Sequence, residues 1–255
     1  MVKLKEIKDF LESVVPLEAQ DSWDNSGLQI GSLEAEVRTV GFALSVSRSV
    51  IEEAKEKSVE LLIVHHPIAI SGVKSLVPYT YPSNLFLSLA KEGISVYALH
   101  TNLDVSPFGP TALICEELSL EGGPIVSSPP YGRIGELPSF VTQRELLEKL
   151  RSFLPPDVFR VVNFKPDETV RRVAVCSGSG ASFIDTVAGR AQLFITGDLK
   201  YHDALKAQDL GLTVFDLGHF ATERLFYLPL RKLLAEAFPS LNFVVLSEKS
   251  PFEVA

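Results

Sequence analysis

The chain has few of the residues that carry covalent or redox chemistry: two cysteines, five histidines and one methionine in 255 residues. Cys115 and Cys176 belong to no C-x-x-C pair, so we expect two buried, reduced thiols rather than a catalytic nucleophile. No apolar run approaches the ~18 residues that a membrane-spanning helix needs. The first 19 residues mix charges among apolar side chains, unlike a signal peptide, so we expect a cytoplasmic protein.

Runs of lysine and arginine are also absent. The chain carries 32 acidic and 24 basic side chains, for a net charge of −8 and a pI of about 5.2. Nucleic-acid affinity comes largely from clustered lysine and arginine on phosphates, so this composition argues against a nucleic-acid partner. A hydrophobic content of 46% with 22% charged residues is typical of a globular protein with a substantial core.

Apolar runs alternate with segments of helical periodicity along the whole chain. In the first half we expect helices near residues 4–15, 47–58, 83–93 and 111–118, and strands near 37–46, 59–64 and 94–99. In the second half we expect helices near 142–154, 200–211 and 221–238, and strands near 157–164, 170–176, 191–196, 212–215 and 241–247. Such alternation favours βαβ units and a mostly parallel sheet.

The sequence texture changes near residues 121–139, which are rich in glycine, proline and serine. We place a boundary between two halves here, at 1–125 and 126–255. The second half repeats the alternation of the first without a residue-level repeat. The expected fold is therefore α/β, with two similar α/β/α halves around mostly parallel central sheets.

Every histidine lies within a few residues of the C-terminal end of an expected strand. The histidines are His65, His66, His100, His202 and His219, and the carboxylates near them are Asp104, Asp198 and Glu223. Ligands of open α/β sheets bind outside the carboxyl ends of the strands. Neutral imidazole and carboxylate are good ligands for zinc, iron, manganese, cobalt or nickel. The pattern predicts a metal site at this edge.

The adjacent pair His65–His66 favours two ions over one. Side chains alternate in an extended segment, so the two imidazoles would point in opposite directions unless the chain turns there. The two imidazoles could instead bind one ion each, as in two-metal hydrolases, whose two ions lie ~3.5–4 Å apart. His219 and Glu223 would share one helix face. Taken singly, each histidine also fits a hydrogen-bonded loop residue, Asp198 a helix cap and Asp104 a turn residue.

Two further stretches are less specific. Trp23 lies in the turn-rich segment 21–31, and we expect it to pack over the core as a lid rather than act as a functional aromatic. Residues 177–182, SGSGAS, follow an expected strand. They lack the G-x-G-x-x-G spacing and the P-loop lysine, so we expect a tight turn between strand and helix rather than a phosphate site.

Five motifs together resemble the Nif-three-like family, also known as the GTP cyclohydrolase I type 2 family. They are WDNSGLQIG, IVHHPI, ALHTNLD, VCSGSGAS and ITGDLKYHDALKAQDLGLTVFDLGHFATE, and they follow the family's order from about residue 21 to residue 223. The resemblance implies a two-part α/β/α fold, in the short form without the inserted middle domain. It also implies a dinuclear metal centre and a homohexameric toroid whose metals face the cavity.

The resemblance also implies roles for individual residues. The implied metal ligands are His65 and His219 for one ion, His66 and Asp104 for the other, and Glu223 as the bridge. His100, Asp198 and His202 would lie close by, and we expect His100 or His202 to carry protons, since imidazole titrates near neutral pH. Ser45 departs from the family pattern, because it stands where the family usually has an aspartate.

Two functions follow from this ligand set. A metal-dependent hydrolase would act on a nucleotide or on another phosphorylated or purine substrate, with two ions activating water. A non-catalytic metal-binding or regulatory scaffold, assembled as a toroid, would need the same ligands without turnover. We expect two divalent transition-metal ions per chain, and the mixed donors admit zinc, iron, manganese, cobalt or nickel. The expected partners are copies of the same chain, as a hexamer, and a small molecule.

Overall fold

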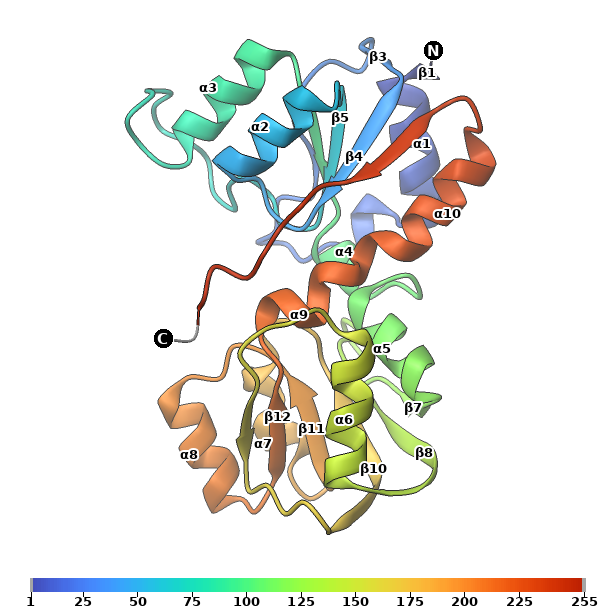
Figure 1. Cartoon of the computed structure of the whole chain (residues 1–255), viewed down its shortest axis with the longest axis vertical. Helices are drawn as coiled ribbons and strands as arrows, with labels where there is room; N and C mark the ends of the chain where they lie inside the picture. The colour runs from blue at the N-terminus through green and yellow to red at the C-terminus, as the bar shows by residue number, and fades with distance from the viewer. Residues whose placement is uncertain (1, 254–255) are drawn as a thin grey trace. The chain divides into compact units, whose positions relative to one another are not determined.

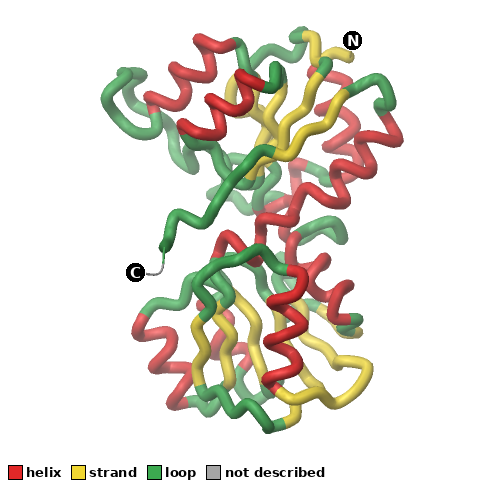
Figure 2. The backbone as a smooth tube through the Cα atoms, in the orientation of Figure 1, coloured by secondary structure: helices red, strands yellow, loops and turns green. Residues whose placement is uncertain are grey.

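The computed structural model describes residues 2–253 of the chain (Figures 1 and 2). The described residues form two compact units: unit 1 contains residues 2–108 and 226–248, and unit 2 contains residues 109–225 and 249–253. The first change of unit therefore comes at residue 108/109, earlier than the expected boundary at 125/126. Helix α5 (Pro110–Leu118) belongs to unit 2 because Ile114, Cys115 and Leu118 pack into the core of that unit.

Unit 1 is built on a five-stranded sheet within the described residues. The order is β13 (Asn242–Val245), β4 (Thr39–Ala43), β5 (Leu61–Val64), β6 (Ser95–Ala98) and β2 (Gly27–Ile30). All neighbours pair in parallel except β2, which runs antiparallel to β6. The parallel pairing of β13 with β4 explains why the segment 226–248 belongs to unit 1. A short ribbon, β1 (Val2–Lys3) with β3 (Glu36–Val37), lies outside this sheet.

Helices cover both faces of this sheet (Figure 1). The helices of unit 1 are α1 (Leu4–Val14), α2 (Arg48–Glu56), α3 (Ser83–Glu92), α4 (Thr101–Asp104) and α10 (Tyr227–Ala237), with a 3₁₀ turn η1 (Leu17–Ala19). Alternate strand residues serve the two faces: Leu62 and Val96 pack against α2 and α3. On the other face the Tyr97 hydroxyl donates to Glu12 of α1, and the Phe42 ring lies 6.0 Å from the ring of Tyr227 in α10.

Unit 2 repeats this architecture around a six-stranded sheet of described residues. The order is β7 (Glu121–Gly123), β8 (Arg133–Thr142), β10 (Thr169–Val175), β11 (Leu193–Thr196), β12 (Thr213–Asp216) and β9 (Arg160–Val162). The central strands β10, β11 and β12 are parallel, and the outer pairs are antiparallel. The α/β prediction with mostly parallel central sheets is therefore confirmed.

The helices of unit 2 also lie on both faces of its sheet (Figure 1). Helix α6 (Gln143–Phe153) packs with α5 on one face, and α7 (Ile184–Val187) packs with α8 (Tyr201–Asp209) on the other. A 3₁₀ turn η2 (Ala181–Phe183) precedes α7. The helix expected over 221–238 begins earlier, as α9 (His219–Glu223), and a 3₁₀ turn η3 (Arg224–Phe226) separates it from α10.

The glycine-rich stretch expected to separate the two halves forms a strand pair instead. Strand β7 pairs antiparallel with β8, and Gly122 lies opposite Gly135. A Cβ at Gly122 would lie 2.1 Å from the Ile134 carbonyl oxygen, and a Cβ at Gly135 would lie 2.1 Å from the Glu121 carbonyl oxygen. The glycines thus permit close approach of two strands. A glycine-rich sequence by itself does not distinguish a pair of closely approaching strands from a linker.

Both cysteines are buried, as predicted. Burial raises the pKa of the Cys115 thiol to about 12, against a smaller lowering by the charge of Arg133. Over the span from residue 2 to residue 253, no helix combines the length and apolar character that crossing a membrane requires.

Candidate metal centre

Three neighbouring strand ends of unit 1 supply the first group of candidate ligands. Ala43 of β4 pairs with Val64 of β5, and Val64 pairs with Ala98 of β6, so the three strands end side by side. His65 and His66 follow β5 directly, and His100 follows β6 as the residue before α4. The parallel register therefore gathers these side chains at one edge of the sheet.

The chain turns at His65–His66. The carbonyl oxygen of Leu44 accepts hydrogen bonds from the backbone amides of both histidines, at 3.2 and 3.0 Å. Two consecutive amides that point at one oxygen cannot belong to an extended strand, in which successive amides alternate. The ring centroids consequently lie 5.0 Å apart. The expectation of opposite directions holds only for an extended segment, and the turn removes it.

His100 joins this pair. Its ring centroid lies 5.2 Å from that of His65 and 5.6 Å from that of His66. Each of the three histidines offers a nitrogen within 4.8 Å of the others, close enough for a metal-ligating group. Asp104, the last residue of α4, places its Oδ1 atom 3.5 Å from Nε2 of His65. The family resemblance placed His100 outside the ligand set, as a nearby proton carrier, although it follows the same strand as Asp104.

Each imidazole of this group is anchored through Nδ1. Nδ1 of His65 lies 2.7 Å from the Leu99 carbonyl oxygen, and Nδ1 of His100 lies 2.8 Å from Oδ1 of Asp24. A carbonyl and a carboxylate only accept hydrogen bonds, so in the neutral ring Nδ1 carries the proton and Nε2 the lone pair. Metal-ligating histidines are typically oriented by such a bond from the other ring nitrogen.

His66 differs from its neighbours in the partner that anchors it. Its Nδ1 lies 2.7 Å from the hydroxyl oxygen of Ser45, which follows β4. A hydroxyl both donates and accepts, so this contact orients the ring without fixing which nitrogen carries the proton. The consequence of a serine at position 45 is therefore a less constrained tautomer at His66.

Asp24 is a site residue that sequence reasoning missed. Its carboxylate accepts from His100, from the amide and hydroxyl of Thr101, from the Ser26 hydroxyl and from the Asn25 amide. Burial raises the pKa of the Asp24 carboxyl, but the bonds from His100 and Thr101 outweigh burial and hold that pKa well below its usual value. The signal in the sequence was the aspartate of the WDNSG motif, which has the composition of an ordinary turn.

Trp23 does not form the expected lid over the core. Its side chain is 56% exposed, and its ring meets that of His100 edge-on at 6.0 Å. The buried member of this turn is the adjacent Asp24, whose side chain is fully buried. The hydrogen bonds of that carboxylate fix the turn and leave the neighbouring indole outside the core.

Unit 2 supplies the second group of candidate ligands. His219 begins α9 and Glu223 ends it, and Nε2 of His219 lies 2.8 Å from Oε2 of Glu223, as the i, i+4 spacing predicts. Nδ1 of His219 lies 2.6 Å from Oδ2 of Asp198, so this imidazole too is anchored by an acceptor. Burial lowers the pKa of His219, but the charge of Glu223 and the bond to Asp198 raise it to about 11.

The SGSGAS segment is a tight turn that serves this group. The amide of Gly178 donates to the Thr222 hydroxyl at 2.9 Å, and the amide of Gly180 donates to the Thr196 hydroxyl at 3.0 Å. Gly178 has φ +59°, and a Cβ there would lie 1.9 Å from Oε1 of Glu223. The amides of Gly178 and Gly180 thus bond within the protein, as in a tight turn between strand and helix. Gly178 leaves the space that the Glu223 carboxylate occupies.

His202 is the predicted residue with the weakest structural support. It lies exposed on α8, where its ring meets that of Tyr201 edge-on at 5.2 Å. Among residues 2–253 it belongs to none of the groups of three metal-ligating side chains. Its assignment as a proton carrier stays a prediction from the family resemblance.

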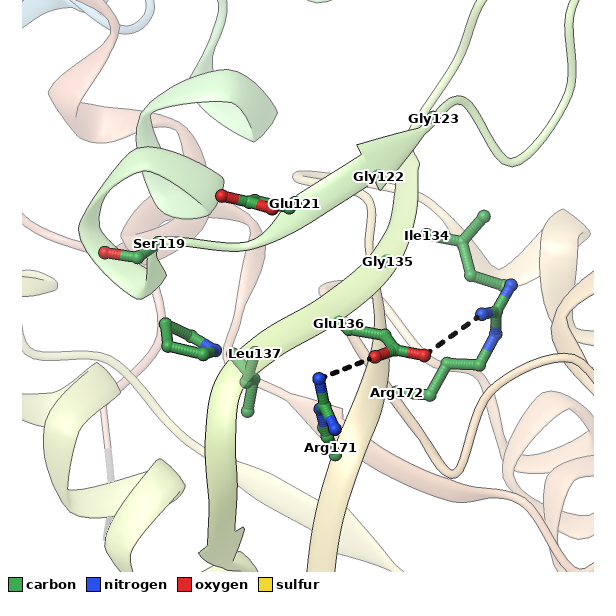
Figure 3. A pocket seen from close by; sticks show the side chains of 11 residues that line it. Ser119, Glu121, Gly122, Gly123, Ile134, Gly135, Glu136, Leu137, Arg171 and Arg172 are labelled. Carbon is green, nitrogen blue, oxygen red and sulfur yellow. Dashed lines mark ion pairs between the residues drawn. The ribbon is translucent and has the colours of Figure 1, made fainter.

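A cavity of about 540 Å³ lies elsewhere in unit 2, beside strands β7, β8 and β10 (Figure 3). Glu136 lies between Arg171 and Arg172, with oxygen–nitrogen distances of 3.1 and 3.7 Å. Much of the remaining wall is the backbone of β7 and β8. None of the predicted ligands lines this cavity, and three of its charged side chains, Glu136, Arg171 and Arg172, pair with one another.

The donor chemistry of the two groups fits divalent transition metals. Imidazole nitrogen and carboxylate oxygen are the donors that zinc, iron, manganese, cobalt and nickel share. The anchoring acceptors at Nδ1 of His65 and His100 leave the lone pair of the neutral ring on Nε2, whereas His219 has a carboxylate at each nitrogen, so an ion bound at its Nε2 would replace a proton there. The described residues therefore could hold metal, in a donor set that does not select one ion.

Comparison with known families gives one match across almost the whole chain. Residues 2–251 match the sequence model of the family described as Duf34/NIF3 (NGG1p interacting factor 3). A Campylobacter jejuni protein named GTP cyclohydrolase 1 type 2 homolog is 33% identical over 252 residues, which cover 99% of both chains. A Helicobacter pylori (strain J99) protein named GTP cyclohydrolase 1 type 2 is 32% identical over 260 residues, which cover both chains completely.

Solved structures share the fold. The structure described as reduced HcgD from Methanocaldococcus jannaschii is 31% identical, with a TM-score of 0.85 and coverage of 97% of this chain and 98% of the other. A Bacillus cereus protein related to NIF3 superposes with a TM-score of 0.89 at 21% identity, over 100% of this chain and 99% of the other. The second likeness shows the fold alone.

Proposed function

The chain belongs to the Duf34/NIF3 family, and we propose that it is a metal-dependent hydrolase that binds two divalent transition-metal ions. The observation that carries the proposal is the gathering of His65, His66 and His100 at one sheet edge, each anchored through Nδ1. Anchored imidazoles are typical of metal ligands, whereas a surface loop histidine needs no such partner.

We assign the ligands as the family resemblance implies. They are His65, His66 and Asp104 of unit 1 and His219 and Glu223 of unit 2. Two imidazole–carboxylate pairs support the assignment, one in each unit: His65 with Asp104 at 3.5 Å, and His219 with Glu223 at 2.8 Å. Carboxylate beside imidazole is a common donor combination for divalent transition metals.

The chemistry of this site would divide between the metal and the chain. Bound divalent ions would lower the pKa of a metal-bound water and would stabilise developing negative charge. Asp24 holds His100 in one orientation, so that Nε2 of His100 is placed to take or give a proton. Asp198 likewise fixes the orientation of the His219 ring, which is assigned as a metal ligand. His202 is the second proposed proton carrier, on the resemblance alone.

The proposed substrate is a nucleotide or another phosphorylated or purine compound. The support is the name GTP cyclohydrolase 1 type 2, which a Helicobacter pylori relative carries at 32% identity over its full length. Hydrolysis of either a phosphoester or a purine ring develops negative charge on oxygen, which divalent ions stabilise. The metal site alone does not choose between these substrates.

Elemental analysis and an activity panel test the proposal together. We expect about two transition-metal ions per chain, and turnover of GTP or a phosphoester with at least one of manganese, iron, cobalt, zinc or nickel. His100→Ala should retain metal and lose turnover if His100 carries protons, whereas loss of metal would make it a ligand. Stoichiometric metal without turnover across the panel would favour a non-catalytic metal-binding scaffold.

Variants of the two ligand sets show whether they serve one centre. We expect His66→Ala in unit 1 and Glu223→Ala in unit 2 each to reduce the metal content. If the two sets share a centre, their effects on metal affinity should be non-additive in the double variant. Additive losses would instead indicate separate sites in the two units.

We also propose that the chain assembles as a cytoplasmic homohexamer, arranged as a toroid. The support is the family resemblance, which also places the metals toward the cavity. Sedimentation equilibrium should then give a mass six times that of the 28.0 kDa chain. A monomeric mass across micromolar concentrations would overturn this part of the proposal without touching the metal site.

A further inference from the structure

The segment Leu44–Ser45, which anchors His66, is itself held by a residue from the end of the chain. Glu248 follows β13, and its Oε2 accepts from the Leu44 amide at 2.7 Å while its Oε1 accepts from the Ser45 amide at 3.1 Å. Both oxygens of one carboxylate therefore face two consecutive amides. All of these residues belong to unit 1.

The position of Glu248 follows from the way β13 and β4 end. The two strands pair in parallel up to Val245 opposite Phe42, and the Leu246 amide, just past β13, donates to the Phe42 carbonyl oxygen. The amides of Leu44 and Ser45 follow β4, past the paired residues, and each of them needs an acceptor. The Glu248 carboxylate meets this need, and an ionised acceptor makes the stronger hydrogen bonds.

These contacts connect Glu248 to the metal site through the segment Leu44–Ser45. The amides of Leu44 and Ser45 are held by Glu248, and the Leu44 carbonyl oxygen accepts from the amides of His65 and His66. The Ser45 hydroxyl then meets Nδ1 of His66 at 2.7 Å. Since a hydroxyl fixes an imidazole less firmly than a carboxylate does, the orientation of His66 depends on how rigidly the Ser45 backbone is held.

We propose that Glu248 is a positioning residue of the metal centre: by holding the Leu44–Ser45 backbone it fixes the Ser45 hydroxyl against His66. The inference rests on the proposed metal function. We assign Glu248 a positioning role and not a ligand role, since each of its two carboxylate oxygens accepts from a backbone amide.

The chain offers a matched control at the opposite end of the same strand. Oε2 of Glu60 accepts from the amides of Arg38 and Thr39, at 3.1 and 2.8 Å, where β4 begins. Glu60→Ala and Glu248→Ala therefore each remove a carboxylate that holds two consecutive amides at one end of β4. Both variants should lower the urea unfolding midpoint, and only Glu248→Ala should disturb His66.

The test measures Co²⁺ affinity by chelator competition and, in metal-free protein, the imidazole ¹⁵N shifts of His66. We expect Glu248→Ala to weaken Co²⁺ binding about tenfold and to shift the His66 nitrogens, with Glu248→Gln in between, since it keeps one acceptor oxygen. Glu60→Ala should leave both readouts at wild-type values. In a Ser45→Ala background, Glu248→Ala should weaken binding no further, because its effect passes through Ser45.

Two results would overturn the proposal: His66 shifts in Glu248→Ala that match wild type, or additive losses in the double variant. Because the ¹⁵N readout uses metal-free protein, it still tests Glu248 if the wild-type chain binds no Co²⁺. In that case the metal function fails separately. If Glu248→Ala does not fold, Glu248→Gln carries the same comparison against Glu60→Gln.

Discussion

Gly178→Ala tests the geometry of the second ligand group. Gly178 has φ +59°, and an alanine in the left-handed region costs roughly 1–2 kcal/mol. Its Cβ would lie 1.9 Å from Oε1 of Glu223, whereas ordinary contacts begin at 3.4 Å, so the carboxylate would have to move by the difference of 1.5 Å. That oxygen belongs to a side chain only 6% exposed, which limits where it can go.

A movement of this size would separate Glu223 from His219, whose Nε2 now lies 2.8 Å from Oε2. We expect Gly178→Ala to weaken Zn²⁺ binding by at least about a hundredfold, above the tenfold to hundredfold typical of residues that only orient ligands. The free energy of unfolding of the metal-free protein should fall by roughly 2–4 kcal/mol, from the backbone cost and the displaced carboxylate.

Gly211→Ala is the control for this prediction. Gly211 has φ +66°, but a Cβ there would meet no described atom within 4 Å. It should therefore lose only the backbone contribution of roughly 1–2 kcal/mol and keep wild-type Zn²⁺ affinity. Chelator competition gives the affinities and urea unfolding gives the stabilities. Equal Zn²⁺ affinities for the two variants would refute the assignment of Glu223 as a ligand held in place by this turn.

Three further predictions follow from the other buried groups. Asp24→Asn should lower the free energy of unfolding by roughly 1.5–3 kcal/mol, because it removes the charged acceptor of His100 and Thr101; an unchanged urea midpoint would contradict this. The Cys115 thiol has a pKa of about 12, so about one in ten thousand is ionised at pH 8. Ellman's reagent should therefore modify Cys115 slowly until urea unfolds the protein. Rapid labelling of the folded protein would contradict the burial of this thiol. Removal of metal with dipicolinate should lower the Tm, and added Zn²⁺ should restore it, whereas the Tm of His65→Ala should respond to neither. A wild-type Tm that does not change with metal would contradict metal binding to the folded state.

The elements that the sequence predicted well are those whose pattern is local. Helix α1 shows Leu4, Ile7 and Leu11 at helical spacing, and all three are buried. Ser47 caps α2 by accepting from the Val50 amide, and Gly93 ends α3 in the left-handed conformation, as their residue types indicate. The histidines at the ends of β5 and β6 were found because parallel strands place their carboxyl ends together.

The features that escaped prediction depend on contacts between distant segments. Glu248 and Ser45 are 203 residues apart, so no spacing rule joins them. Asp24 lies 76 residues from His100, in a segment with ordinary turn composition. The turn at His65–His66 depends on the carbonyl oxygen of Leu44, the residue after the neighbouring strand β4. Such partners become visible only when the sheet has brought the strand ends together.

Anomalous scattering from crystals grown with Zn²⁺ tests the central claim most directly, with data collected above and below the zinc edge. We predict an anomalous peak ~2.0–2.1 Å from Nε2 of His65, with Nδ1 of the same ring still donating to the Leu99 carbonyl oxygen. A zinc peak at Nδ1 of His65, or no peak beside this ring in zinc-saturated crystals, would contradict it.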